Sequence, residues 1–304
     1  SPPSVEELVG VPARELAGEL ARRRIGASNA RALLRRVLRP EPERGVFYYP
    51  RRGYGQISDA LAGAATDAGA RIVMDAEVVG LRATVDGVDV HTAAGRIAAR
   101  HVWSTLPMQL LARIASAPPE VAVAAAGLES RTLTLAYLVL ERSRWTEYDA
   151  HYFPERDVPM VRVSEPKNYR DTGDDPSDVT VLCAELPGDV DDAGERVVDA
   201  LRRNALRCPD PVAIEVRRVL RAYPVYRVGF ERAFATLDSW ASRLPNVVSF
   251  GRQGLFAHDN THHALAMAWA AADAYSSASD SSGGVDARAW ADARERFDAH
   301  VVED

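Results

Sequence analysis

A short segment near the carboxyl end, GRQGLFAHDNTHH (251–263), carries residue types that bind an anionic group. Gly251 and Arg252 follow a predicted strand, and a predicted helix begins at about residue 261. The first N–H groups of a helix have no acceptor within the helix and carry a partial positive charge. With Arg252 beside them, they suit a phosphate. The alternative is an ordinary strand-loop-helix connection in which Asn260 caps the helix.

Three of the seven histidines lie within this segment, at His258, His262 and His263, next to Asp259. Imidazole and carboxylate groups bind metal ions, so a metal site is one interpretation. His258 and His262 are four residues apart, but the predicted helix begins between them, so they lack the i, i+4 spacing within one helix that a helical zinc site uses together with a nearby carboxylate. We therefore favour surface or capping histidines, with an imidazole that faces a bound ligand as the second alternative.

A glycine-rich turn, RRGYG, contains Arg51, Arg52 and Tyr54 and leads into a predicted helix at 56–68. Arginines in such a turn can hold a carboxylate or phosphate through two parallel hydrogen bonds. A solvated charged turn is an equally weighted alternative.

Two further segments carry polar candidates. Lys167, the only lysine of the chain, lies in SEPKN (164–168) and either orients a substrate anion or belongs to a salt-bridged structural loop. Tyr226, in AYPVY (222–226), is a candidate substrate contact as an aromatic cavity wall. For this tyrosine we favour the alternative, a core residue with a satisfied hydroxyl.

Composition and charge exclude several classes of protein. The 304 residues are 47% hydrophobic with a net charge of −6, which is typical of a globular chain and lacks the footprint of a nucleic-acid-binding protein. The sequence contains no run of 18 apolar residues, so it predicts no membrane span. The first residues do not resemble a signal peptide. Two cysteines without a Cys/His cluster predict neither a metal nor a disulfide framework. We expect a cytoplasmic protein.

The elements that position these residues follow from hydrophobic periodicity and from turn residues. Helices are predicted within 4–40 and at 56–68, 107–116, 121–128, 191–207, 231–243, 261–276 and 285–302. Strands are predicted within 71–106, with turns at Asp86-Gly87 and Ala94-Gly95, and at 131–141, 150–153, 158–164, 180–186, 214–220 and 247–251. The mixture predicts an α/β fold combined with α+β.

Three segments resemble the FAD-dependent amine-oxidase-like flavoproteins, a group that includes protoporphyrinogen oxidases, phytoene desaturases and UDP-galactopyranose mutases. They are the stretch 49–107 with its GRIAARHVWSTLP pattern, the pair SEPKN and AYPVY, and GRQGLFAHDNTHHALAMA (251–268). The resemblance implies FAD as the cofactor. It places Val78, Gly251, Arg252, Asn260 and Thr261 around FAD, and Arg51, Arg52 and Tyr54 in the substrate cavity. His262 stands where the family commonly has aspartate, which puts that cofactor contact in doubt.

The family begins with a strand, a G-x-G-x-x-G turn and a helix, and this segment is absent from the sequence. The chain is therefore expected to be a fragment, to have lost its start, or to have discarded the part that binds the AMP half of FAD. Gly53-Tyr54-Gly55-Gln56-Ile57-Ser58, followed by Glu77, imitates that turn. The family places this strand-turn-helix near the flavin ring and the substrate instead.

The implied architecture has two domains. It comprises a helical part of the substrate domain (1–43), part of the FAD-binding domain (44–106), a substrate domain with a mixed or antiparallel sheet (107–245), the return to the FAD-binding domain (246–276), a linker (277–284) and an amphipathic helix (285–304). This last helix is expected to support a homodimer or to bind a partner chain.

The resemblance implies an FAD-dependent oxidoreductase that acts on a small-molecule substrate, with hydride passing to the flavin. A flavin-dependent isomerase that resembles the sugar-nucleotide mutases is the first alternative. The second is a vestigial flavoprotein without cofactor, which works as a cyclase, an isomerase or a partner subunit.

Overall fold

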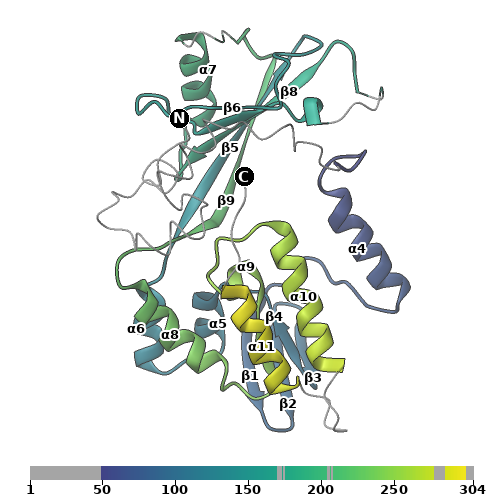
Figure 1. The fold of residues 1–304 in the computed structure, drawn as a ribbon, viewed down its shortest axis with the longest axis vertical. Coiled ribbons are helices and arrows are strands. Elements are labelled where there is room, and N and C mark those ends of the chain that lie inside the picture. Colours follow the sequence, from purple (N-terminus) through teal and green to yellow (C-terminus); the bar gives the residue numbers. More distant parts are fainter. Residues whose placement is uncertain are drawn as a thin grey trace, which may run out of the picture. The chain divides into compact units, whose positions relative to one another are not determined.

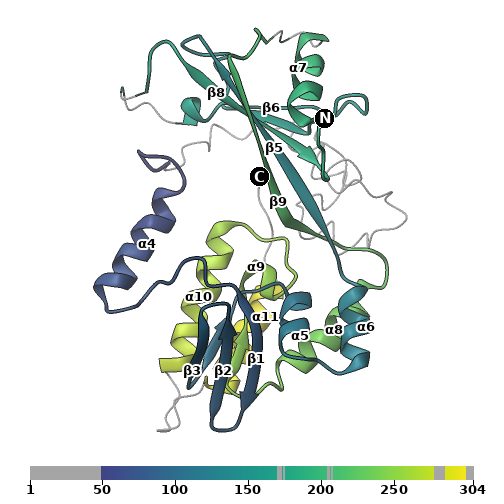
Figure 2. The same ribbon diagram turned by 180° about the vertical axis from the view of Figure 1, so that it is seen from behind.

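The computed structural model describes residues 49–169, 173, 175–203, 206, 208–276 and 285–298, shown in Figures 1 and 2. The described chain forms two compact units. Unit 1 contains 49–73 and 130–223, and unit 2 contains 74–129 and the residues from 224 onwards. The division into domains at 106 and 245 stays a prediction. The predicted helices within 4–40 and the linker 277–284 lie outside the described residues.

Unit 1 is built on a five-stranded sheet with the strand order β6-β7-β8-β5-β9. Its strands are β5 (Glu129–Leu140), β6 (Ala150–Tyr152), β7 (Arg162–Ser164), β8 (Thr180–Pro187) and β9 (Ala213–Val225). Helix α7 (Ala193–Arg203) packs on one face of the sheet (Figure 1). Leu138, Leu182 and Val197 are fully buried between them. The alternation of side chains along each strand leaves the intervening residues on the opposite face.

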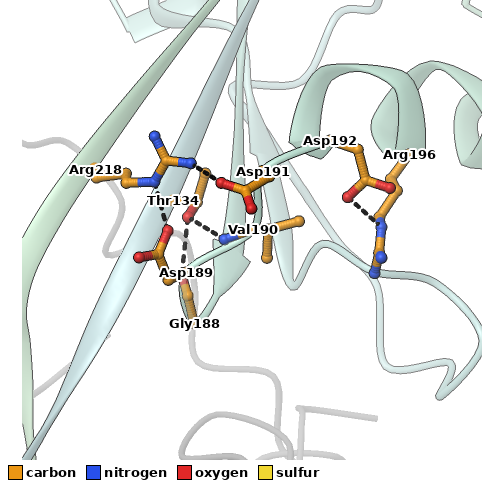
Figure 3. A network of polar contacts seen from close by, with 8 residues as sticks. All are labelled: Thr134, Gly188, Asp189, Val190, Asp191, Asp192, Arg196 and Arg218. Atoms are coloured by element: carbon orange, nitrogen blue, oxygen red, sulfur yellow. Dashed lines mark hydrogen bonds and ion pairs between the residues drawn. The ribbon is translucent and has the colours of Figure 1, made fainter.

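The connection from β8 to α7 is held by polar contacts (Figure 3). The Thr134 hydroxyl donates to the Gly188 carbonyl at 2.8 Å and accepts the Val190 N–H at 3.2 Å. Arg218 on β9 bridges Asp189 and Asp191 at 2.5 Å each. The loop is therefore fastened to β5 and β9 before α7 begins.

The turn at 50–55 leads into α4 (Gln56–Asp67), a helix with no buried residue. The residues after it, 71–77, form no strand, so the prediction that strands begin at 71 is wrong. Ile72, Val73 and Met74 are 50%, 53% and 77% exposed. A strand needs a neighbour to satisfy its backbone groups, and the described residues supply none beside this segment.

Unit 2 contains a three-stranded antiparallel sheet of β1 (Val78–Thr84), β2 (Gly87–Thr92) and β3 (Gly95–Ala99). Both predicted hairpin turns are confirmed, because β1 pairs with β2 up to Thr84 and Gly87, and β2 pairs with β3 up to Thr92 and Gly95. Strand β4 (Val102–Ser104) pairs in parallel with β10 (Val247–Ser249). Helices α5 (Met108–Ile114), α6 (Pro119–Ala126) and α8 (Phe230–Ala241) pack together beside them.

The carboxyl-terminal part of unit 2 contains α9 (Gly251–Gly254), α10 (Thr261–Ser276) and α11 (Ala287–Asp298). The apolar stripe of α11, formed by Trp290, Ala293 and Phe297, packs against a core that includes Met267 and Ala271 of α10. This stripe is therefore packed within the chain, and the expected role of the helix in binding a partner stays a prediction. No helix among the described residues is long and apolar enough to cross a membrane.

Candidate functional site

The loop between β10 and α10 is shaped by two glycines. Gly251 follows the extended residue Phe250 and has a φ of +81°, a conformation that glycine adopts without strain. A Cβ on Gly254 would lie 3.0 Å from the Ser249 hydroxyl and 3.3 Å from the Ser104 carbonyl oxygen. The turn of α9 therefore lies directly against the ends of the parallel strands.

Tyr226 holds the same loop through two hydrogen bonds of its hydroxyl group. Its ring is 4% exposed and its hydroxyl donates to the Phe256 carbonyl at 3.1 Å. The hydroxyl also accepts the backbone N–H of His258 at 2.8 Å. These contacts favour the core alternative for Tyr226, and they make it the residue that fixes the approach to α10.

Helix α10 begins at Thr261, the start expected from sequence. His263 Nδ1 accepts the backbone N–H of Asn260 at 3.2 Å, as the third residue of a helix does in a capping box. Thr261 and His262 are exposed. The first turn of α10 therefore presents N–H groups without an acceptor in the helix on an accessible surface.

A buried carboxylate lies just before this turn. Asp259 is 2% exposed, and its Oδ1 is 3.8 Å from His263 Nδ1. The positive end of α10 favours a negative charge at this place. No group of histidine, cysteine, aspartate or glutamate side chains in the described ranges could hold a metal ion, and His258, His262 and His263 form no such cluster.

Two other expected cofactor positions lie in the same unit. Arg252 occupies the second position of α9 and is half-buried. Val78 begins β1 opposite Thr92, just before a bulge in the pairing of β1 with β2, and Glu77 before it is exposed. The structure thus places Gly251, Arg252, Asn260, Thr261 and His262 in one short segment, and Val78 on a separate strand.

In unit 1 the structure brings together two segments that are far apart in sequence. Gly53, of the arginine turn, and Lys167, of the SEPKN loop, line one open pocket of about 250 Å³. Arg51 and Arg52 are exposed, and Tyr54 is 52% exposed. The other lining residues are Tyr49, Pro166, Asp175, Pro176, Val179, Thr180 and Val181.

The ammonium group of Lys167 donates hydrogen bonds to three backbone carbonyl groups of its own chain. The Nζ atom donates to the carbonyl oxygens of Ser143 at 2.8 Å and Val179 at 2.9 Å, and also to that of Pro176. An ammonium group has three N–H donors, so all of them are occupied. This arrangement favours the structural-loop alternative for Lys167.

Glu165, two residues earlier, is only 1% exposed and organises the loop before β6. Its Oε1 accepts the Trp145 N–H at 2.8 Å and the Thr180 hydroxyl at 2.7 Å. Its Oε2 accepts the Thr146 N–H and the Asn168 side-chain amide, both at 3.1 Å. Four uncharged donors among the described residues therefore satisfy this buried carboxylate, which indicates a structural role.

The sheet face opposite α7 carries a cluster of polar and aromatic side chains that the sequence analysis missed. Arg162 on β7 lies across from Glu185 on β8 and from Tyr152 on β6. Its Nε donates to Glu185 Oε1 at 3.0 Å, and its guanidinium carbon lies 6.0 Å from the centre of the Tyr152 ring. Burial opposes the charge of Arg162, but the Glu185 carboxylate holds its pKa above the ordinary value.

Further side chains extend this cluster, which we call the open sheet face. Cys183 lies opposite Tyr137, and burial raises the pKa of the Cys183 thiol to about 11. Burial also raises the pKa values of Tyr137 and Tyr169. The ring of Tyr169 stacks on that of Tyr49, with centroids 5.2 Å apart. The open sheet face therefore consists of Tyr49, Tyr137, Tyr152, Arg162, Tyr169, Cys183 and Glu185.

These residues carry no motif that could have found them. Five of them stand alone in ordinary strand segments, such as RVS or TVLCAEL, and strand pairing places these five together. Tyr49 and Tyr169 lie outside the strands and join the cluster through their stacked rings. One sequence signal could have indicated this face. Cys183 and Glu185 alternate with the apolar residues of β8, and such alternation marks a strand face that is not part of the core.

The chain is similar to known flavoproteins in both sequence pattern and fold. Residues 5–280 match the model of the family described as flavin containing amine oxidoreductase. No curated protein sequence matches the chain significantly. The family match covers most of the chain, including the arginine turn, the open sheet face and the loop before α10.

Several solved structures share the fold at low identity. A reduced UDP-galactopyranose mutase has a TM-score of 0.76 at 16% identity, over 96% of this chain and 66% of its own. A putative protoporphyrinogen oxidase from Exiguobacterium has a TM-score of 0.52 at 14% identity, over 64% of this chain and 46% of its own. Cyclohexylamine oxidase from Brevibacterium oxydans has a TM-score of 0.50 at 17% identity, over 67% and 48%.

The chain thus spans less than two thirds of the length of these proteins. The mixed α/β and α+β architecture expected from sequence is confirmed, since both the family match and the mutase structure cover nearly all of the chain. The chain belongs to the flavin containing amine oxidoreductase family.

Proposed function

We propose that the protein is an FAD-dependent oxidoreductase of the amine-oxidase type that acts on a small organic substrate. The observation that carries this proposal is the loop 251–262 within a chain that matches a flavin-containing family. A glycine with positive φ, an arginine and an accessible helix N-terminus follow one another there.

The residues of this loop fit a dinucleotide cofactor. The exposed first turn of α10 offers N–H donors at Thr261 and His262, and Gly251 keeps the backbone free of a side chain at the turn. Arg252 adds a positive charge for a phosphate. Asn260 holds the start of the helix, and Val78 offers its backbone at the start of β1.

For the substrate we propose the open sheet face of unit 1. Arg162 is oriented by Glu185 and keeps 36% of its side chain exposed, so it can donate to an electron-rich substrate group. The rings of Tyr49, Tyr152 and Tyr169 offer flat apolar surfaces for the carbon skeleton. When FAD is bound, it supplies the electron-accepting chemistry, and the protein supplies position and electrostatics.

The second candidate is a flavin-dependent isomerase that catalyses no net redox change. The similarity to UDP-galactopyranose mutase over 96% of the chain favours it. Arg51, Arg52 and Arg252 would then bind phosphates. Turnover without any consumption of oxygen or of another electron acceptor would support this candidate, and acceptor-dependent turnover would support the oxidoreductase.

The first experiment is a titration of the purified chain with FAD, followed by visible absorbance and flavin fluorescence. We expect saturable binding, which Arg252→Ala weakens about tenfold, because one charge-assisted hydrogen bond is worth about 1.5 kcal/mol. Arg232→Ala, an exposed arginine of α8 in the same unit, is the matched control and should leave binding unchanged. A chain that shows no saturable binding of FAD would contradict the proposal and favour the alternative without cofactor.

A further inference from the structure

The edge strand β9 is unusual for the apolar residues that it exposes. It is the last strand of the five-stranded sheet and pairs on one side with β5. Around it, Val212, Ile214, Val219 and Leu220 are 56%, 43%, 41% and 63% exposed. Natural edge strands are kept short or bent, or carry charges that repel a second strand. Strand β9 is long, exposes apolar residues and carries Glu215 and Arg217, whose opposite charges can attract a second copy, so it can serve as a pairing surface.

The regular part of this edge has two defined ends. Pro211 precedes it and has no N–H to donate, and Arg221 has a φ of +54°, which interrupts the extended backbone. The part of β9 before this interruption is therefore 213–220, and its alternate residues 213, 215, 217 and 219 are centred on Val216. Two copies of a segment that pair antiparallel about a two-fold axis overlap completely when that axis passes through the central residue.

The backbone direction agrees with such a pairing. The Val212 N–H donates to the Val139 carbonyl of β5 at 2.9 Å. Because N–H and C=O groups alternate between the two sides of a strand, the residues 213, 215, 217 and 219 direct theirs to the edge of β9 that no described strand covers. An axis at Val216 places 213 opposite 219 and 215 opposite 217, so these groups satisfy one another in about eight hydrogen bonds.

The side chains are self-complementary in the same register. Glu215 meets Arg217 of the other copy twice, and Val212 meets Leu220 twice, while Val216 meets itself. The guanidinium of Arg218 is already held by Asp189 and Asp191, as Figure 3 shows, so its charge is compensated. A shift of the axis to 215 or 217 would place Glu215 opposite Glu215, or Arg217 opposite Arg217. Repulsion between these like charges disfavours both shifted registers.

We infer that β9 is the interface of a homodimer in which two copies of this chain join their sheets edge to edge, centred at Val216. This interface is distinct from the expected one at the carboxyl-terminal helix, because the apolar stripe of α11 packs within its own chain. It concerns assembly and goes beyond the proposed catalytic function.

Two measurements test this inference on the full chain. Sedimentation equilibrium should give about twice the monomer mass of 33.1 kDa at micromolar concentration. Glu215→Arg should weaken the dimer about tenfold, since it creates like-charge contacts at both symmetry-related positions, and the double variant Glu215→Arg with Arg217→Glu should restore it. Urea unfolding of the same variants separates these effects from the ion pair that Glu215 and Arg217 form within one chain.

The second measurement is oxidative cross-linking. Val216→Cys places two thiols in a directly opposed pair without mutual backbone hydrogen bonds, where the Cα separation permits a disulfide. Leu220→Cys is the matched control, because each Leu220 faces Val212 of the other copy and lies far from its own copy. A monomeric wild-type chain would overturn the inference. So would a dimer that neither Glu215→Arg weakens nor Val216→Cys cross-links.

Discussion

The hydroxyl of Tyr226 accepts the backbone N–H of His258 at 2.8 Å while it donates to the Phe256 carbonyl at 3.1 Å. One buried side chain thereby fixes both sides of the residue that precedes His258, and Phe256 itself has a φ of +48°. These two hydrogen bonds therefore fix the conformation of the loop before α10.

We therefore expect Tyr226→Phe to destabilise unit 2 by about 1–3 kcal/mol, because it removes one hydrogen bond to the partly buried N–H of His258 and one to the buried carbonyl of Phe256. Urea unfolding followed by far-UV circular dichroism measures this change. Tyr148→Phe is the control, since Tyr148 is 59% exposed, and its effect should stay within about 0.5 kcal/mol. Equal effects of the two substitutions would contradict the anchoring role.

The glycines of the same loop give a graded prediction. Gly254→Ala should destabilise the protein by about 1–3 kcal/mol, because its Cβ would press on Ser249 and on the Ser104 carbonyl. Gly251→Ala should cost about 1–2 kcal/mol through its positive φ alone, since its Cβ meets only Thr105 at 3.6 Å.

The control for both is Gly63→Ala in the exposed helix α4, where a Cβ meets nothing within 4 Å. Glycine is unfavourable inside a helix, so this substitution should stabilise the chain by about 0.5–1 kcal/mol. Differential scanning calorimetry of the three variants should show two decreases and one increase in Tm. A decrease for Gly63→Ala would show that α4 is not the exposed helix seen here.

Glu165→Gln should destabilise unit 1 by about 2–4 kcal/mol. The carboxylate accepts four hydrogen bonds in a buried place, and a glutamine amide would turn two N–H donors toward groups that are themselves donors. Glu147→Gln changes an exposed residue of the same loop and should have almost no effect. Thermal unfolding of the two variants compares them directly, and similar midpoints would refute a structural role for Glu165.

The elements of the fold differ in how far the sequence predicts them. Helix α10 has the bounds expected from its capping residue and apolar periodicity, since both signals are local. The segment 71–77 was expected to be a strand from the same kind of signal, but a strand depends on a neighbour that its own residues do not encode. The pairing of Arg162 with Glu185 likewise depends on register between β7 and β8, which no local pattern fixes.

His151 gives a prediction about pH. Burial lowers its pKa, against the opposing influence of Glu165 and Asp149, and its Nε2 is 2.8 Å from the Thr146 hydroxyl. The unfolded chain then binds a proton more readily than the folded chain, so stability should fall as the pH falls below about 6.5. The measurement is the urea midpoint from pH 8 to pH 5. His151→Asn should show a weaker pH dependence than the wild-type protein, and identical profiles would contradict the prediction.

The two cysteines should be unreactive in the folded protein. Burial raises the pKa of Cys183 and of Cys208 to about 11 each, and no disulfide joins them. At pH 8 only about one thiol in a thousand is then a thiolate, compared with about a quarter in an unfolded chain, and the thiolate is the reactive form. Reaction with an aromatic disulfide reagent should therefore be slow without denaturant and rapid for both thiols in urea. Rapid reaction of the folded protein at one thiol would show that the open sheet face around Cys183, or the surroundings of Cys208, admit solvent more freely than the structure indicates.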